Sequence, residues 1–109
     1  MAINSKQKGK SGELELAHIL KKYGYDARRS VQYSGANGDA DVVGLDGVHI
    51  ECKRVERLNI YDAMEQSIRD AREGETPVVM HRKNRKGWLV TMRLDDFMRG
   101  FKNGEKEKD

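Results

Sequence analysis

Apolar residues recur at helical spacing in two parts of the chain. Over residues 11–23 they fall on one helical face, with Ser11 placed to cap the start and Gly24 to end the helix. A second apolar stripe predicts a helix over residues 60–73, with Asn59 as its N-cap. The pattern therefore predicts two amphipathic helices that each bury one face.

Other segments alternate between apolar and polar residues or form short apolar runs, as strands do. Turn residues separate these segments, and the stretch over residues 94–101 favours a short final helix. The predicted order is α-β-β-β-α-β-β-α, which is typical of a mixed α/β sandwich around one central sheet. The predicted strands are residues 25–32, 40–45, 48–53, 77–81 and 88–93.

The turn at residues 46–47 predicts a hairpin with two alternative registers. A two-residue loop would set Asp41 opposite Cys52, so that Asp41 would point away from Glu51. A three-residue loop, with glycine in the left-handed position, would set Asp41 opposite Glu51 instead. We favour the second register because it places the two carboxylates side by side.

Composition narrows the class of protein. With 109 residues, of which 36% are charged and 37% apolar, the chain has the length of one domain and can fill a small core. The single cysteine excludes a disulfide scaffold and a cysteine zinc cluster, and no apolar run is long enough for a membrane span. We therefore expect a soluble, cytoplasmic protein with no membrane partner.

The two ends of the chain are polar. Residues 1–11 carry lysines without any acidic residue and predict a flexible basic arm. Residues 102–109 contain no apolar residue and predict a disordered tail, which leaves residues 12–101 as a single domain. The formal net charge of +3 is too small to identify a partner by itself.

Glu13, Asp41, Glu51 and Lys53 combine into a candidate catalytic set. Glu51 and Lys53 are two residues apart on one predicted strand and therefore share a face. Glu13 lies on the apolar stripe of the first helix, where a carboxylate needs a partner. Each residue alone has a common structural explanation, such as a solvated ion pair, a turn or a favourable helix charge. Their combination favours a site in which a cation joins the carboxylates.

The chemistry predicted for this set follows from its oxygen ligands. Carboxylates completed by waters suit magnesium or manganese. Such an ion lowers the pKa of a bound water and stabilises charge that develops on a phosphate. Lys53 could orient or deprotonate the water, or neutralise the transition state. The set therefore predicts phosphodiester hydrolysis with Mg²⁺ or Mn²⁺.

The order of these residues along the chain resembles that of a known enzyme class. Glu13 on a helix, Gly38-Asp39-Ala40-Asp41 opening a strand and Glu51-Cys52-Lys53 on the next strand resemble the PD-(D/E)xK nuclease superfamily. The resemblance implies a restriction-endonuclease-like αβββαβ core, with a central mixed sheet flanked by helices. More narrowly, short segments within residues 8–98 are similar to archaeal-type Holliday junction resolvases: residues 8–16, 22–25, 29–30, 76–79 and 87–88. This implies a homodimeric, magnesium-dependent endonuclease that cuts branched DNA.

Carried onto matching positions, the resemblance assigns a role to each member of the set. Asp41 and Glu51 would be metal ligands, with the backbone carbonyl of Cys52 as a candidate third ligand. Lys53 would assist the water, and Glu13 would complete the metal shell, either directly or through a water molecule.

Three further assignments stay open. Asp39 is a rival metal ligand because its even spacing from Asp41 gives it the same face. The serine that the family uses in the loop before the aspartate could be Ser30 or Ser34. Gln66 is at a position where some branches of the superfamily carry a glutamine near the site, and the alternative is a place on a solvated helix face.

Basic residues flank both ends of the predicted site and predict a track for DNA. Lysine and arginine contacts to phosphates release counterions, so binding should weaken steeply with salt. Nothing in the sequence reads bases, which favours structure-selective recognition. The alternatives are a nuclease acting on flaps, nicks or duplex DNA, and a non-catalytic DNA-binding module. The candidate DNA-binding residues are Lys8, Lys10, Arg28, Arg29, Arg54 and Arg57, together with Ser30 and Ser34.

Overall fold

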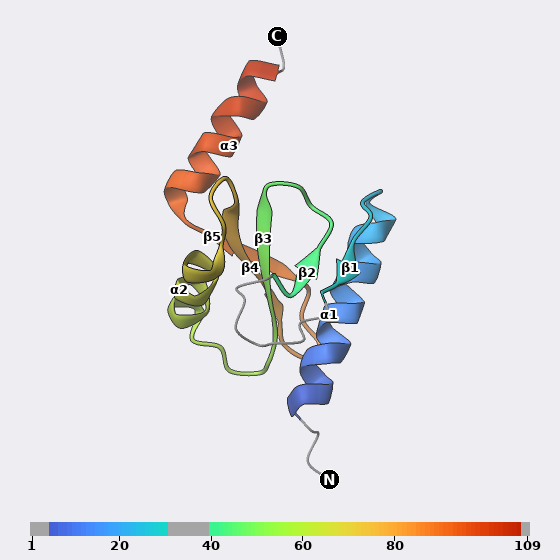
Figure 1. Cartoon of the computed structure of the whole chain (residues 1–109). Helices are drawn as coiled ribbons and strands as arrows, with labels where there is room; N and C mark the ends of the chain where they lie inside the picture. The colour runs from blue at the N-terminus through green and yellow to red at the C-terminus, as the bar shows by residue number, and fades with distance from the viewer. Residues whose placement is uncertain (1–4, 31–39, 108–109) are drawn as a thin grey trace.

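A mixed β-sheet lies between helices α1 and α2, which pack against its two faces (Figure 1). The computed structural model describes residues 5–30 and 40–107. Within this part of the chain the sheet has the strand order β1-β2-β3-β4-β5, with β3 and β4 parallel and the other neighbours antiparallel. The predicted α/β class with a central mixed sheet flanked by helices is confirmed. The elements are α1 Ser5–Lys22, β1 Arg28–Arg29, β2 Val42–Val43, β3 Val48–Arg54, α2 Ile60–Asp70, β4 Thr76–Arg82, β5 Leu89–Met92 and α3 Leu94–Glu107.

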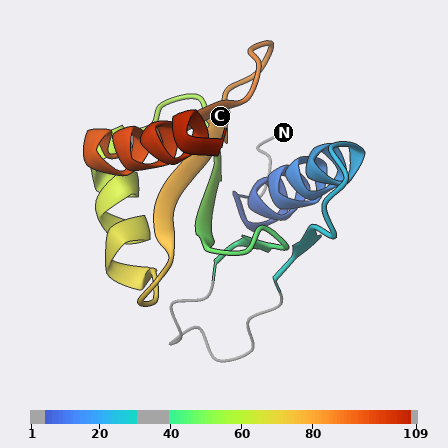
Figure 2. The same cartoon turned by 90° about the horizontal axis from the view of Figure 1, so that it is seen from above.

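Each face of the sheet carries its own buried cluster, and one helix covers each cluster (Figure 2). Side chains alternate along a strand, so Val78 and Met80 join the cluster under α1 while Val79 joins the cluster under α2. The first cluster contains Leu16, Ala17, Ala27, Val42, Ile50, Cys52, Val78 and Met80, and the second contains Ala63, Met64 and Val79. The same alternation turns the polar residues His49 and Glu51 away from the first cluster.

The β2–β3 hairpin has the register that the sequence analysis favoured. Val42 pairs with Ile50, which leaves three residues in the loop and sets Asp41 opposite Glu51. Two glycines make this turn accessible: Gly47 has a φ of +79°, and Gly44 has a φ of +122°. A Cβ atom on Gly44 would lie 2.4 Å from the backbone oxygen of Asp26, so no other residue fits there without a shift.

At both ends of the described chain the structure differs from the sequence-based prediction. α1 begins at Ser5, so residues 5–11, predicted as part of a flexible arm, are helical. α3 runs to Glu107, so most of the tail predicted as disordered is helical as well. Lysine, glutamine and glutamate favour helices. Because the unfavourable step is formation of the first turn, such residues extend a helix at a small cost in free energy once another segment has formed that turn. The predicted strand over residues 25–32 is represented by the two residues of β1, and residues 31–39 lie outside the described part.

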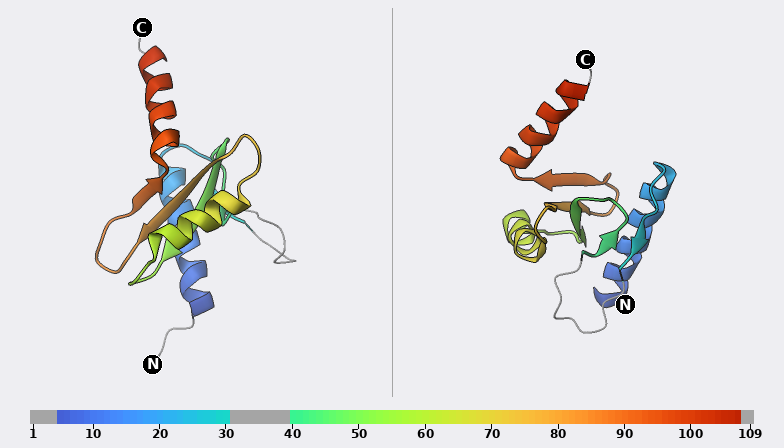
Figure 3. Two further views of the ribbon diagram at one scale, coloured as in Figure 1. Left: turned by 90° about the vertical axis from the view of Figure 1, so that its left-hand side faces the viewer. Right: turned by 45° about the horizontal axis from the view of Figure 1, so that its top comes forward.

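α3 differs from the other two helices because it projects beyond the sheet (Figure 3). Its apolar side chains are exposed, including Phe97 and Phe101, whose rings stack with centroids 6.1 Å apart. None of the helices in the described ranges is long and apolar enough to cross a membrane. The apolar face of α3 is therefore an exposed surface feature.

Candidate active site

The four residues of the predicted catalytic set line one pocket of about 330 Å³. α1 contributes Glu13, the residue before β2 contributes Asp41, and β3 contributes Glu51 and Lys53. These residues are far apart in sequence, and the hairpin register together with the packing of α1 brings them together. The remaining lining residues are Gly9, Cys52, Arg54, Val55 and Gln66.

Asp41 and Glu51 form the acidic centre of this pocket. One carboxylate oxygen of Asp41, Oδ2, accepts a hydrogen bond of 2.8 Å from the backbone N–H of Cys52, which fixes the side chain against β3. Burial, followed by the negative charge of Glu51, raises the pKa of Asp41 to about 7. The Cys52 N–H and the Lys53 ammonium lower it only in part. The pocket therefore holds more negative charge than the nearby lysine offsets.

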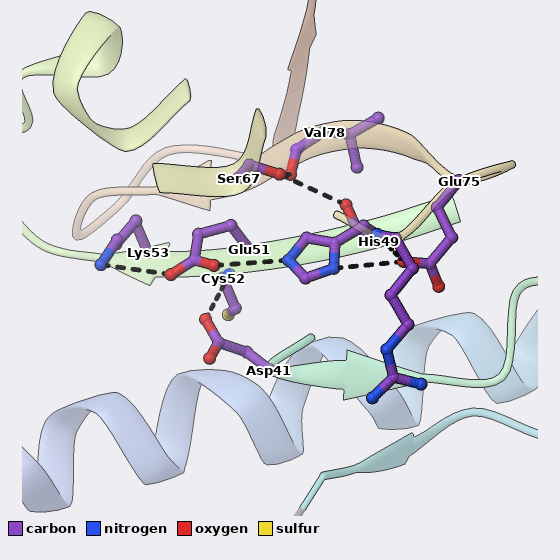
Figure 4. A network of polar contacts seen from close by, with 9 residues as sticks. Asp41, His49, Glu51, Cys52, Lys53, Ser67, Glu75 and Val78 are labelled. Carbon is purple, nitrogen blue, oxygen red and sulfur yellow. Dashed lines mark hydrogen bonds and ion pairs between the residues drawn. The ribbon is translucent and has the colours of Figure 1, made fainter. Parts of the chain in front are cut away.

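Glu51 is buried and lies between two nitrogen groups (Figure 4). Its Oε2 atom is 3.6 Å from Nζ of Lys53, and its Oε1 atom is 3.9 Å from Nε2 of His49. Lys53 is about one third exposed, so its ammonium lies at the mouth of the pocket while the carboxylate lies inside. This is the arrangement expected for a carboxylate and an ammonium on alternate residues of one strand.

Glu13 is engaged by a partner of its own. Its Oε1 atom accepts a hydrogen bond of 2.6 Å from Nε of Arg29, and both side chains are largely buried. Within the described residues, no group of three or more His, Cys, Asp or Glu side chains is placed to hold a metal ion. A direct bond from Glu13 to a metal therefore has no support in this geometry, whereas the hairpin register sets Asp41 opposite Glu51.

A hard divalent cation fits the donors that remain. Magnesium commonly takes one or two protein carboxylates and keeps several waters, which later give way to substrate phosphate oxygens. A cation between Asp41 and Glu51 would also relieve the repulsion that raises the Asp41 pKa. The Cys52 side chain is not a competing ligand, because it lies in the cluster under α1 and burial raises its thiol pKa to about 12.

His49 and Glu75 extend the polar cluster away from the pocket, and the sequence analysis did not include them in the site. His49 is 1% exposed, and its Nδ1 atom lies 3.6 Å from Oε1 of Glu75. The attraction of the Glu51 carboxylate is the main cause that raises the pKa of His49, with Glu75 adding to it and burial opposing it. The alternation of β3 places His49 beside Glu51, but the position of Glu75 depends on the parallel pairing of β3 with β4.

α2 carries Gln66 to the pocket, where it is one of the lining residues. The next residue, Ser67, is completely buried and donates a hydrogen bond of 2.9 Å to the backbone oxygen of Val78. This contact fixes α2 over the sheet and thereby orients Gln66. Of the two interpretations of Gln66, a residue near the site and one on a solvated helix face, the geometry therefore favours the first.

A second ionic cluster lies beside the pocket and is built around Glu15. Its Oε1 atom accepts hydrogen bonds from Arg82, at 2.6 Å, and from the indole of Trp88, at 2.9 Å. Its Oε2 atom is 3.6 Å from Nε of Arg54. Gly12 allows this close approach, since a Cβ there would lie 2.8 Å from Cβ of Arg54. Arg54, predicted to bind DNA, therefore has a structural partner while it also lines the pocket.

The other predicted DNA-binding residues are distributed around the site. Lys10, Arg28 and Arg57 are exposed, Arg29 is paired with Glu13, and the backbone N–H of Ser30 donates to the Asp41 carbonyl at 3.0 Å. Ser34 and Asp39 lie outside the described residues, as does the side chain of Lys8. The choice between Ser30 and Ser34, and the rival role of Asp39, stay predictions.

Comparison with known proteins agrees with the fold. A family model described as "Phage putative PDDEXK endonuclease" matches residues 4–107. The chain belongs to this endonuclease family. A solved structure of Hjc from Archaeoglobus fulgidus, a Holliday junction resolvase from an archaeal hyperthermophile, matches with a TM-score of 0.61 and 25% sequence identity, over 76% of this chain and 75% of that one. Comparison with curated proteins gives no match.

Family membership makes this protein a nuclease, and it confirms the resemblance on which the residue assignments rest. The pocket at Asp41, Glu51 and Lys53 is then the candidate active site. Its donor set is of the kind that holds a divalent metal ion.

Proposed function

We propose that this nuclease is a divalent-metal-dependent endonuclease of branched DNA, with the four-way Holliday junction as its preferred substrate. The observation that carries the proposal is the pocket in which Asp41, Glu51 and Lys53 meet, within a fold that matches an archaeal junction resolvase. Magnesium is the proposed ion, and manganese would substitute because both accept carboxylate and water oxygens.

Asp41 and Glu51 would hold the cation, with the Cys52 carbonyl as a candidate third protein ligand and Glu13 acting through water. When bound, the ion would lower the pKa of a water molecule and stabilise negative charge on the phosphate. Lys53 is positioned by Glu51 at the pocket mouth, where its ammonium can orient the attacking water or neutralise charge on the phosphate. Gln66, from α2, adds a neutral hydrogen-bonding group on the same wall.

The exposed basic residues Lys10, Arg28 and Arg57 would hold the DNA by its phosphates. Arg54 and Arg29, which line or border the pocket, would contribute to the positive field there while they remain paired with Glu15 and Glu13. Phosphate contacts of this kind favour recognition by shape, and they make binding sensitive to salt.

A homodimer is part of the proposal because two paired cuts in a junction require two active sites. The surface that suits a second copy is formed by α3 and the edge strand β5, which expose a row of large apolar side chains. An unpaired edge strand and an apolar helix face of this size are commonly covered by a partner. The exposed side chains are Leu89, Val90, Leu94, Phe97, Met98 and Phe101.

The test of substrate and ion is cleavage of a labelled four-way junction beside a linear duplex of the same sequences, with Mg²⁺, Mn²⁺ or a chelator. Paired cuts confined to the junction, dependent on metal and abolished in Asp41→Asn, would support the proposal. Equal cutting of flaps, nicks or duplex would replace junction resolution by a broader nuclease activity. Tight binding without cleavage under any ion would contradict the catalytic assignment.

The test of the dimer is the mass in solution, measured by light scattering with and without junction DNA. The double variant Phe97→Glu/Phe101→Glu should be monomeric and should give single nicks in place of paired cuts. Tyr61→Glu is the matched control, because Tyr61 is an exposed aromatic residue on α2. A parent protein that is monomeric on DNA and still makes paired cuts would contradict the dimer.

A further inference from the structure

A row of alternating acidic and basic side chains runs from the pocket mouth to the far end of β3 (Figure 4). It begins at Lys53, continues through Glu51 and His49, and ends at Glu75. Only its ends reach solvent to any extent, because the side chains of His49 and Glu51 are 1% and 4% exposed. The proposed function uses the first two members, and it gives His49 and Glu75 no role.

The Nε2 atom of His49 is a buried polar atom without a hydrogen-bond partner. Such atoms are rare and costly, and each one in a native structure needs an explanation. The acceptor that it faces is Oε1 of Glu51 at 3.9 Å, which is too long for a hydrogen bond and short enough for a small side-chain rotation to close. His49 is therefore poised to hold one oxygen of Glu51.

The other side of the imidazole is held in place. Oε1 of Glu75 lies 3.6 Å from Nδ1 of His49 and accepts a hydrogen bond of 2.8 Å from the backbone N–H of Arg72. Ser67 packs against the backbone of His49, and its hydroxyl oxygen lies 3.5 Å from the His49 carbonyl oxygen. The ring has little freedom to turn, so its direction toward Glu51 is set by the fold.

The two oxygens of Glu51 then have separate partners. Oε1 faces His49, and Oε2 faces Lys53 and the pocket. Metal-binding carboxylates in proteins are commonly oriented by hydrogen bonds from groups behind them, and loss of such a group typically costs about 10- to 100-fold in metal affinity or activity.

We propose that His49, braced by Glu75, is a positioning residue that holds Oε1 of Glu51 and so presents Oε2 to the catalytic cation. The inference rests on the proposed function, because it takes Glu51 as a metal ligand. It predicts a role in metal binding for two residues that neither contact the metal nor line the pocket.

The experiment measures Mn²⁺ affinity of the full-length protein by the loss of the free-ion electron paramagnetic resonance signal, without DNA. His49→Leu keeps an apolar side chain of moderate size and removes the donor, and it should weaken Mn²⁺ binding by about 10- to 100-fold. His49→Gln keeps an N–H donor near the Nε2 position and should stay within a few-fold of the parent. His81→Leu is the matched control, since His81 lies on the neighbouring strand and contacts Thr91 instead.

If His49→Leu does not fold, Glu75→Gln provides the second variant, because it weakens the brace without emptying the core. It should lower Mn²⁺ affinity by a smaller factor, up to about tenfold. A lower melting temperature with unchanged affinity in the folded variants would overturn the proposal in favour of a purely structural histidine. Tighter Mn²⁺ binding in His49→Leu would also overturn it, because the imidazole would then oppose the cation.

The outcomes separate this inference from the proposed function. A parent protein that binds no Mn²⁺ would refute both the metal site and the positioning role. A parent that binds Mn²⁺ but does not cut junctions would refute only the substrate, and the comparison of His49→Leu with His49→Gln would still decide the role of His49. In a cutting enzyme, the concentration of Mg²⁺ at half-maximal rate should rise in His49→Leu, and excess Mg²⁺ should restore most of the rate.

Discussion

Two carboxylate clusters in this protein share strand β3 and differ in their balance of charge. Around Glu15, one carboxylate meets two arginines and an indole N–H, so its single negative charge is compensated by groups of the protein. Around Glu51, two carboxylates face each other, with Lys53 at the mouth of the pocket. The first cluster has no uncompensated negative charge, whereas the second has room and charge for a cation. Both clusters contain acidic residues. The candidate active site therefore differs from the Glu15 cluster by its excess of negative charge beside a pocket.

The largest effect that tests this comparison is expected from Glu51→Gln. A metal ion is worth several kcal/mol of transition-state stabilisation, and each 1.36 kcal/mol is tenfold in rate, so junction cleavage should fall by about a thousandfold. Stability should change little, because the lost attraction to Lys53 and His49 is offset by relief of the repulsion with Asp41. Single-turnover cleavage and urea unfolding measure the two quantities. An unfolded or fully active variant would contradict the assignment of Glu51.

Lys53→Met should have the next largest effect. The substitution keeps the length and removes the ammonium, so cleavage should fall by about a hundredfold while junction binding changes much less. Mn²⁺ affinity should be retained, since the two carboxylates remain. Binding by fluorescence anisotropy in Ca²⁺ and cleavage in Mg²⁺ separate these effects. A parallel loss of binding and cleavage would make Lys53 a phosphate-binding residue without a role in the chemical step.

Glu15→Gln applies the same chemical change to the cluster around Glu15, and it should lower stability while it leaves most of the cleavage activity. It removes the negative charge that holds Arg54 and Arg82, and Arg54 already has a buried Nε atom without a hydrogen bond. Loss of these partly buried contacts should lower the free energy of unfolding by about 1–3 kcal/mol. Cleavage by the folded fraction should fall less than tenfold. If Glu15→Gln abolished cleavage without loss of stability, the contrast between the two clusters would be wrong.

The sequence allowed most of the site to be predicted because its key relations are local. The two-residue spacing of Glu51 and Lys53 fixes a shared face, and the short hairpin leaves only two registers for Asp41. The partners of Glu15 could not be predicted in the same way, since Arg82 and Trp88 come from β4 and the turn after it. Contacts of this kind depend on strand order, which no local pattern specifies.

The ends of the helices show a second limit of sequence patterns. The stretch at residues 5–11 has no apolar stripe, so its sequence gives no sign of packing and predicts a flexible arm. In the structure it continues α1, and Gly9 from this stretch lines the pocket. Helix propagation from a packed segment requires only permissive residues, which a search for amphipathic periodicity does not register.

The last prediction concerns the pH dependence of stability in the presence of a chelator. The pKa of Asp41 is about 7 in the folded protein and near 3.8 when the chain is unfolded. Because the folded state binds the proton more tightly, this term stabilises the fold fully below the unfolded pKa, and the stabilisation is lost as pH rises toward the folded pKa. Between pH 5 and pH 8 the parent should therefore lose about 2 kcal/mol relative to Asp41→Asn, whose side chain does not titrate.

Urea unfolding of both proteins at pH 5 and pH 8 measures this difference, and the comparison cancels the titration of groups that both proteins share. Addition of Mg²⁺ at pH 8 should restore stability to the parent and much less to Asp41→Asn, because only the ionised carboxylate offers a full charge to the cation. The Glu15 cluster should show neither response, so Glu15→Gln should keep the pH and Mg²⁺ dependence of the parent at lower overall stability. Equal pH dependence in the parent and in Asp41→Asn would mean that neither burial nor the charge of Glu51 raises the Asp41 pKa in the absence of a metal. The acidic pocket would then resemble the cluster around Glu15, and no excess negative charge would be left there to attract a cation.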